Sequence, residues 1–266
     1  MCGIIGYIGK KEALPILISG LKRLEYRGYD SSGVCVLCDN KLKIIKKRGQ
    51  IQELENELIG KEVRGTIGIA HTRWATHGEP NVVNAHPHLD CKNKIAIIHN
   101  GIIENHGALK KILSAEGHKI ISDTDSEIVA HLVEKFYDGS LENAVIKAIK
   151  YIEGTFGLAI ICENEEKIIA VRRGSPLIIG IGDDEMFVAS DASAILEYTK
   201  KVIYINDNEI VNLTKDQYDV KNLNGDVVNS EIQEIKWNLN EIERAGFKHF
   251  MLKEIYEQAK SIENTL

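Results

Sequence analysis

Short runs of β-forming residues recur along this chain, and their number constrains the fold more than any other feature. Each run is apolar or β-branched and is bounded by turn residues. The runs cover residues 4–8, 34–37, 43–46, 66–70, 95–98, 158–161, 167–171, 177–179 and 186–189. So many strands exclude a helical bundle.

Helical patterns lie between these runs. One apolar stripe at three-and-four spacing contains Leu14, Leu17, Leu21 and Leu24, and a second runs through residues 128–136. A third helix is expected over residues 141–152, with Gly154 as a left-handed C-cap. Because strands and helices do not alternate strictly as βαβ units, the pattern predicts α+β layers rather than a doubly wound parallel sheet.

The second helix carries a start signal of its own. Thr124 and Glu127 stand three residues apart, as the N-cap and N3 residues of a capping box do. This spacing predicts that Asp125 lies in the first helical turn, where an acidic side chain normally complements the helix dipole.

Charge and composition limit the partners of the chain. The formal net charge is −6 and the pI about 5.9, so we expect no basic surface for nucleic acid or for an anionic membrane. No apolar run reaches the roughly 18 residues of a membrane span, and the start lacks the basic segment of a signal peptide. No P-loop or dinucleotide fingerprint occurs, so no nucleotide cofactor is expected. A small-molecule partner is favoured.

The cysteines favour a reducing, cytoplasmic location. They are odd in number and sparse, unlike a secreted disulfide framework, and they are Cys2, Cys35, Cys38, Cys91 and Cys162. Cys35 and Cys38 form a C-x-x-C, but residues three apart in a β run point to opposite faces. We therefore expect these two to pack as small apolar side chains and not to share a metal.

Cys2 has the most informative position in the chain. Once the initiator methionine is removed, this residue carries both a thiol and a free α-amine. The ordinary pKa of such an amine is about 7.7 to 8.0 and that of a thiol about 8.5, so the amine can take the thiol proton near neutral pH. Cys2 is therefore a candidate nucleophile with its own base. A retained Met1 would turn that base into an amide nitrogen and leave a folded but poorly active protein.

Asn100 and Gly101 follow an apolar run. A side-chain amide beside an unhindered backbone N–H at the rim of a sheet can form an oxyanion hole, where losing one donor costs about 100- to 1000-fold in rate. The same dipeptide is also typical of a hairpin turn. These residues alone leave both interpretations open.

The segment from His71 to His77 holds an arginine and an aromatic residue after another β run. Arg73 can bind a carboxylate through two parallel hydrogen bonds, or form a surface salt bridge. Together with His86 and His88, the histidines raise the alternative of a metal site. Neither spacing matches the helical H-E-x-x-H signature, so we expect no metal.

These features together describe a pocket for a zwitterionic amino acid with a reactive side-chain carbonyl. Arg73 can bind the carboxylate, Asp125 can accept the α-ammonium, and Cys2 can attack the carbonyl. Glutamine is such a molecule.

The motifs resemble, in order and wording, the glutaminase domain of the glutamine–fructose-6-phosphate aminotransferases, which are class II glutamine amidotransferases. The matching segments extend over nearly the whole chain. They are residues 1–6 (MCGIIG), 24–31 (LEYRGYDS), 71–80 (HTRWATHGEP), 84–88 (NAHPH), 99–105 (HNGIIEN) and 174–176 (GSP). Residues 253–258 (KEIYEQ) resemble the segment that leads into the isomerase half of that family.

This resemblance implies an N-terminal-nucleophile (Ntn) hydrolase fold, a four-layer αββα sandwich with antiparallel sheets, and no metal or other cofactor. It also implies roles for single residues. Cys2 would be the nucleophile and its amine the base, and Asn100 with Gly101 would form the oxyanion hole.

The substrate contacts carry over in the same way. Arg73 would hold the glutamine carboxylate and Asp125 the ammonium, and Thr76 with His77 would line the site. Trp74 would belong to a closing loop. Arg27 would support the nucleophile from a neighbouring loop.

The implied reaction is hydrolysis of L-glutamine to glutamate and ammonia through a γ-glutamyl thioester on Cys2. In the full-length enzyme, which we expect to be a homo-oligomer, the ammonia would convert fructose 6-phosphate to glucosamine 6-phosphate. That step would take place in a C-terminal isomerase half outside this chain. Residues 2–240 would form the glutaminase domain, and residues 241–266 the linker or start of the isomerase half.

Three alternatives remain. The first is the glutaminase domain of another class II amidotransferase, although Trp74-Ala-Thr76 departs from the Tyr-Ser-Thr expected in the purine pathway and favours the sugar branch. The second is a glutamine sensor that binds without turnover. The third is a metal-dependent amidohydrolase, which a chelator should inactivate.

Overall fold

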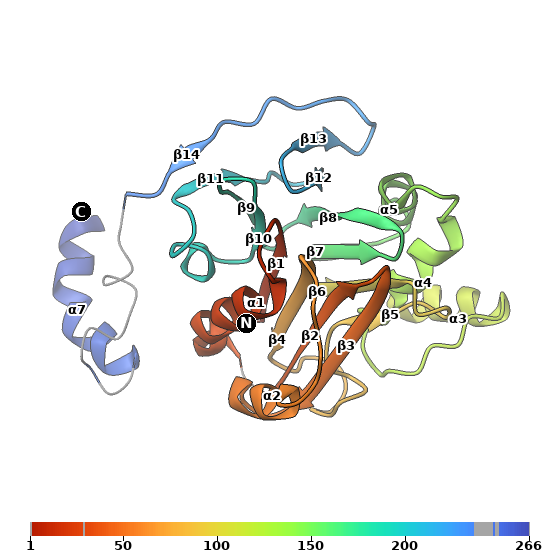
Figure 1. Ribbon diagram of the computed structural model, residues 1–266, viewed down its shortest axis with the longest axis horizontal. Helices are drawn as coiled ribbons and strands as arrows, with labels where there is room; N and C mark the ends of the chain where they lie inside the picture. Colours follow the sequence, from red (N-terminus) through yellow and green to blue (C-terminus); the bar gives the residue numbers. More distant parts are fainter. Residues whose placement is uncertain (1, 29, 237–246, 248–249, 266) are drawn as a thin grey trace.

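The computed structural model describes residues 2–28, 30–236, 247 and 250–265. Two antiparallel sheets are stacked face to face, and helices lie on the outer side of each sheet (Figure 1). This arrangement has the α+β layers that the pattern of strands and helices predicted, and it is the four-layer αββα sandwich that the resemblance implied.

The larger sheet contains the chain segment that follows Cys2. Its strand order is β14-β11-β9-β10-β1-β4-β2-β3, so β1 lies inside the sheet and β3 at one edge. The strands are β1 (Gly3–Ile8), β2 (Ser31–Cys38), β3 (Lys41–Arg48), β4 (Ile67–Arg73), β9 (Ile178–Ile181), β10 (Met186–Ala189), β11 (Lys201–Tyr204) and β14 (Gln233–Glu234).

The smaller sheet contains the Asn-Gly pair. Its order is β13-β12-β8-β7-β6-β5. The strands are β5 (His88–Leu89), β6 (Ile95–Ile103), β7 (Gly154–Cys162), β8 (Glu165–Arg173), β12 (Glu209–Leu213) and β13 (Tyr218–Asn222).

Alternation along the strands builds the core between the sheets. On β1, Ile4 and Ile8 enter the core between the two sheets, whereas Ile5 and Tyr7 enter the core under the helices. This is the period of two that a strand imposes. The cysteines of β2 obey the same rule, since Cys35 lies between the sheets and Cys38 on the helix side. The prediction that this pair faces opposite ways is confirmed.

Two groups of helices complete the layers. The helices α1 (Ala13–Leu24) and α2 (Ile51–Leu58) pack on the larger sheet, and α3 (His106–Ala115), α4 (Glu127–Phe136) and α5 (Leu141–Ile149) pack on the smaller one. Two short 3₁₀ helices are η1 (Glu25–Arg27) and η2 (Ala192–Ala194). The predicted third helix ends earlier than expected, and Gly154 opens β7 with a φ of 114° instead of capping a helix.

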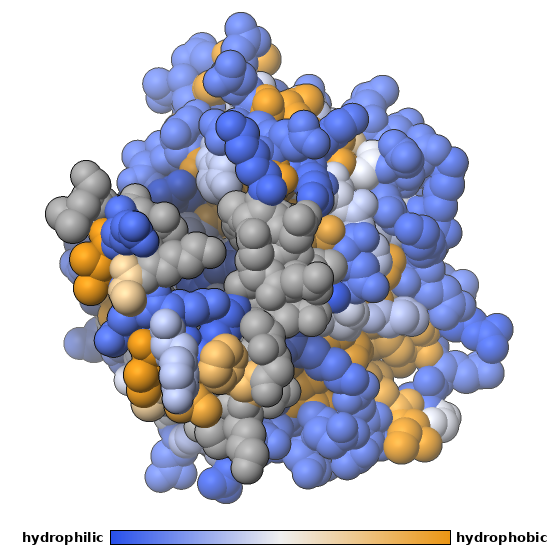
Figure 2. Space-filling model, turned by 90° about the vertical axis from the view of Figure 1, so that its left-hand side faces the viewer, coloured by the Kyte–Doolittle hydropathy of each residue, from blue (hydrophilic) through white to orange (hydrophobic). Residues whose placement is uncertain are grey.

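The last helix, α7 (Phe250–Thr265), lies at one side of the sandwich (Figure 1). Its exposed apolar side chains include Met251, Ile255, Tyr256 and Ile262. Figure 2 looks at this side and shows separate hydrophobic patches on a largely hydrophilic surface. The predicted boundary at residue 240 lies outside the described residues. None of the described helices combines the length and hydrophobicity that a membrane crossing requires.

Candidate active site

One cavity brings together all of the residues predicted for the site. Its volume is about 360 Å³, within the range of small-molecule pockets. The predicted residues in its wall are Cys2, Arg27, Arg73, Trp74, Thr76, His77, Asn100, Gly101 and Asp125. They come from the start of β1, the end of β4 and the loop after it, η1, β6, and the loop before α4.

Strand pairing positions the thiol. Gly3 lies opposite Thr72 in the β1–β4 pair, so Cys2 stands beside the end of β4. A Cβ atom on Gly3 would lie 2.7 Å from the Cβ of Leu24, so glycine lets α1 approach the strand here. The backbone N–H of Trp74 donates to the Sγ of Cys2 at 3.2 Å.

The surroundings of the thiol pull its pKa in two directions. Burial raises the pKa of Cys2, because the thiolate loses water, and the Trp74 N–H opposes this by stabilising the thiolate. Burial is the larger effect, so the pKa is raised overall. A nucleophile in this setting is protonated at rest and needs a base.

The strand β6 runs straight through Asn100 and Gly101 to Ile103. The hairpin-turn interpretation is therefore wrong, and so is the expectation that the strand ends at this pair. Gly101 has a φ of 132°, and a Cβ there would lie 2.0 Å from the carbonyl oxygen of Thr155. Only glycine fits this position, which leaves its backbone unhindered at the cavity.

The amide of Asn100 is oriented by a buried histidine. Its Oδ1 accepts from Nε2 of His71 at 3.0 Å, and its Nδ2 donates to the carbonyl oxygen of Cys2 at 3.2 Å. An amide oxygen can only accept, so the His71 proton lies on Nε2. Burial lowers the pKa of His71 to about 3, which keeps the ring neutral. His71 thus directs the amide N–H₂ of Asn100 toward Cys2.

Arg73 is a buried cation in the cavity wall. Its guanidinium donates to the carbonyl oxygens of His77, Gly78 and Glu79, the last two at 3.1 and 3.4 Å. Among the residues that the structure describes, no carboxylate forms an ion pair with it. A buried charge of this kind favours an anionic ligand group.

Asp125 lies before α4 rather than in its first turn. The helix begins at Glu127, with Ser126 as N-cap, and no side chain caps it. The capping box is therefore wrong: the hydroxyl of Thr124 contacts His88 at 3.1 Å instead. Asp125 accepts from the N–H of Ile103 at 2.7 Å, which attaches it to β6.

The remaining predicted residues lie at the rim. Trp74 is 53% exposed, and Thr76 and His77 follow it in the same loop, with 3.4 Å between the Thr76 hydroxyl and Nδ1 of His77. Arg27 on η1 forms an ion pair of 2.8 Å with Asp191.

Several lining residues were not predicted as members of the glutamine site. They are His86, His99, Ile102, Thr124, Ser126, Thr155, Ser175 and Pro176. Burial lowers the pKa of His99 and lowers that of His86 further. Nδ1 of His86 accepts from the N–H of His99 at 3.2 Å, and Nδ1 of His99 lies 2.8 Å from the Ser126 hydroxyl. Nδ1 of each ring thus has a protein partner, which spacing in the sequence does not reveal.

Comparison with known proteins shows which proteins the chain is similar to. A model described as a glutamine amidotransferase domain matches residues 71–197. A protein of Aquifex aeolicus named glutamine–fructose-6-phosphate aminotransferase (isomerizing) is 52% identical over 267 residues, and one of that name in Thermococcus kodakarensis is 51% identical over 270 residues. The chain is therefore similar to a glutamine amidotransferase domain, and these relatives match it from end to end. The resemblance drawn from the motifs is confirmed.

These matches cover all of this chain but only 45% of either relative, so the chain spans about half the length of the curated relatives it matches. Among solved structures, the glutamine phosphoribosylpyrophosphate amidotransferase from B. subtilis superimposes with a TM-score of 0.74 at 25% identity. That match covers 85% of this chain and 50% of the other. The predicted fold class is thereby confirmed.

Proposed function

We propose that this amidotransferase domain hydrolyses L-glutamine to glutamate and ammonia through a thioester on Cys2. One observation carries the proposal: three groups share the wall of one cavity. They are a partly buried thiol, an oriented amide, and an arginine that forms no ion pair with a carboxylate of the described residues. This combination suits an amino acid that carries a side-chain amide.

The bound substrate is held through the two charged groups on its α-carbon. Arg73 takes the α-carboxylate, and Asp125 takes the α-ammonium through its carboxylate, which β6 holds in place. Thr76 and His77 line the cavity, and Trp74 covers its rim. The side-chain amide then reaches Cys2.

Acylation begins when the free α-amine of Cys2 takes the thiol proton. The thiolate attacks the carbonyl carbon, and the resulting oxyanion accepts from the Asn100 amide and the Gly101 N–H. The C–N bond breaks, and the amine returns its proton to the departing nitrogen, which leaves as ammonia. Water then attacks the thioester and gives a proton to the same amine; the C–S bond breaks, glutamate is released, and the amine returns the proton to the thiolate.

For the whole protein we propose the activity for which these relatives are named. Ammonia would pass to fructose 6-phosphate in a C-terminal half, with residues 2–240 as the glutaminase domain and 241–266 as the linker or start of that half. The 45% coverage of the relatives supports this. A cytoplasmic, homo-oligomeric full-length enzyme completes the proposal, and the free state of all five cysteines agrees with a reducing compartment.

The test is glutamate release from glutamine by protein that lacks Met1, compared with Cys2→Ala. We expect the variant to lose at least about 10⁴-fold in rate while it stays folded and still binds glutamine. Equal release by both proteins would overturn the thiol mechanism. Binding without release by either supports a sensor, and loss of release with a chelator supports a metal amidohydrolase.

A further inference from the structure

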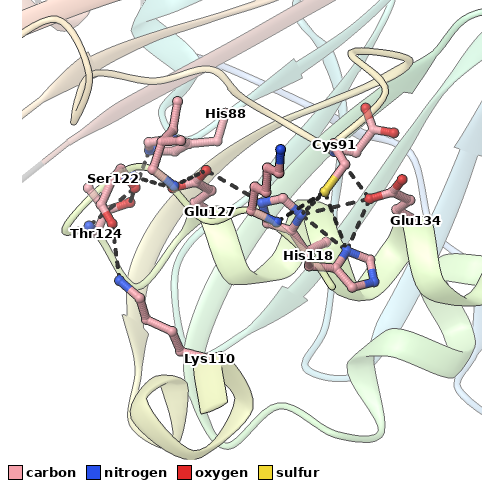
Figure 3. Close-up of polar contacts among 12 residues, drawn as sticks. His88, Cys91, Lys110, His118, Ser122, Thr124, Glu127 and Glu134 are labelled. Atoms are coloured by element: carbon pink, nitrogen blue, oxygen red, sulfur yellow. Dashed lines mark hydrogen bonds and ion pairs between the residues drawn. The ribbon is translucent and has the colours of Figure 1, made fainter. Parts of the chain in front are cut away.

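A second cluster of chemically reactive side chains lies away from the glutamine cavity, on the helix side of the smaller sheet. It consists of Cys91 in the β5–β6 turn, His118 after α3, and His131 and Glu134 on α4. Figure 3 shows Cys91, His118 and Glu134 pointing toward one another. We name these four residues the Cys91 cluster.

The ligand atoms of the Cys91 cluster converge. One donor atom from each residue lies within 4.8 Å of all the others. Nδ1 of His118 and Nδ1 of His131 are 3.3 Å apart, and the Cys91 Sγ lies 3.4 Å from His131 and 3.7 Å from His118. Glu134 Oε2 lies 3.1 Å from Nδ1 of His118 and 3.7 Å from Nδ1 of His131.

The five separations, from 3.1 to 3.7 Å, are close to those between the ligands of a tetrahedral zinc ion. With Zn–S of about 2.3 Å and Zn–N and Zn–O of about 2.0 to 2.2 Å, tetrahedral ligands stand roughly 3.3 to 3.6 Å apart. One thiolate and one carboxylate would also balance the charge of a divalent ion. From this geometry we propose that Cys91, His118, His131 and Glu134 form a binding site for a divalent transition metal, with zinc as the expected ion.

A second carboxylate prepares His131 for this role. Nε2 of His131 lies 3.4 Å from Oε1 of Glu127, and a carboxylate can only accept, so the proton is on Nε2. The Nδ1 lone pair is then directed at the Cys91 cluster. A carboxylate behind a ligating histidine is the usual arrangement at zinc sites.

Four protein ligands fill a tetrahedron, which is typical of a structural zinc rather than a catalytic one. The ion would join α4 to the β5–β6 turn and to the loop after α3. Glu127 also accepts from the N–H of Ile121, in the segment that leads to Asp125. On binding, the Cys91 thiol gives its proton to solvent and its sulfur pair to the metal.

Cobalt(II) is the probe, because it reports tetrahedral geometry and thiolate ligation in its absorption spectrum. The background is Cys2→Ala, which removes the other accessible thiol. We expect the metal-free full chain to bind one equivalent with tetrahedral ligand-field bands and a thiolate-to-cobalt charge-transfer band, and zinc to displace it.

Variants then locate the site. Cys91→Ser should abolish the charge-transfer band, and His118→Ala should weaken binding at least about tenfold. His106→Ala is the matched control, since this histidine is also partly exposed, and it should bind as the parent does. Circular dichroism checks the folding of each variant, with Glu134→Gln as a further ligand variant.

The competing explanation needs no metal. His118 can pair as a cation with Glu134, while the Cys91 thiol donates to Nδ1 of His131. Absence of tetrahedral bands in the folded parent would overturn the proposal in favour of this network. A thiolate-to-cobalt charge-transfer band that persists in Cys91→Ser would overturn it as well.

Discussion

The glutamine cavity and the Cys91 cluster both combine one cysteine with histidines, but their ring nitrogens are used differently. In and behind the cavity wall the histidines contact different protein atoms, as His71 contacts Asn100 and His99 contacts Ser126. In the cluster the Nδ1 atoms of His118 and His131 face each other at 3.3 Å. Residue type therefore does not decide the chemistry. Divergent nitrogens orient neighbouring groups, and convergent ones offer lone pairs to an ion.

After the loss of the Cys2 thiol itself, the largest effect is expected at the amide that His71 orients. Asn100→Ala should lower kcat by about 100- to 1000-fold with little change in KM, because it removes a donor to the oxyanion. Steady-state glutamate release measures this. Asn56→Ala, at an exposed position on α2, is the control and should be unchanged. A kcat within a few-fold of the parent would remove Asn100 from the mechanism.

Stabilisation of the fold by zinc tests the Cys91 cluster. Zinc at a hundredfold excess over its Kd should add about 2.7 kcal/mol to the free energy of unfolding. In the Cys2→Ala background this corresponds to a rise in Tm of about 5 to 10 °C. Thermal denaturation with and without zinc measures this rise. Cys91→Ser should show no rise. An equal rise in both proteins would mean that zinc binds elsewhere.

Arg73→Lys tests the carboxylate contact. Lysine keeps the charge but loses the planar fork, so we expect kcat/KM for glutamine to fall about 10- to 100-fold, mainly through KM. The parent should prefer glutamine strongly over its α-carboxamide, and the variant should prefer it less. Arg64→Lys, at an exposed position, is the control. A variant that discriminates as the parent does would contradict the assignment.

Acid should weaken the cavity scaffold. Burial lowers the pKa of His71 to about 3, from an ordinary value of about 6.5. A histidine whose pKa is depressed by folding contributes stability that is complete above pH 6.5 and is lost as the pH falls toward 3. At pH 5 that loss is about 2 kcal/mol.

Urea unfolding at pH 7 and pH 5 measures this difference. His71→Gln keeps a donor for Asn100 but cannot titrate, so its loss of stability between the two pH values should be about 2 kcal/mol smaller. His106→Gln should behave as the parent does. The idea fails if His71→Gln loses as much stability as the parent.

Local signals in the sequence predicted much of the fold and most of the cavity wall. Each predicted β run overlaps a strand, and the apolar stripe of residues 128–136 lies on α4. The strands β5, β11, β12, β13 and β14 were not predicted, nor was the order of strands in either sheet. Strand order depends on pairing between distant segments, which periodicity does not encode.

The errors at the site have the same origin. Thr124 has the spacing of a capping residue, but its hydroxyl forms a hydrogen bond with the buried ring of His88 instead of capping the helix. Asn100-Gly101 has the composition of a turn, but β7 pairs with β6 along the whole length of β6, including these two residues. The Cys91 cluster joins three separate segments, and only His131 and Glu134 are close in sequence. In each case a tertiary contact decided what local spacing left open.

The most direct measurement is the mass of the domain during turnover. Protein without Met1 is mixed with glutamine, quenched in acid and digested, and the N-terminal peptide is weighed. The proposed mechanism predicts an added γ-glutamyl group on Cys2 that hydroxylamine removes and that Cys2→Ala lacks. Steady glutamate release with an unmodified Cys2 peptide at every quench time would contradict the mechanism. A γ-glutamyl group found on another residue would contradict it as well.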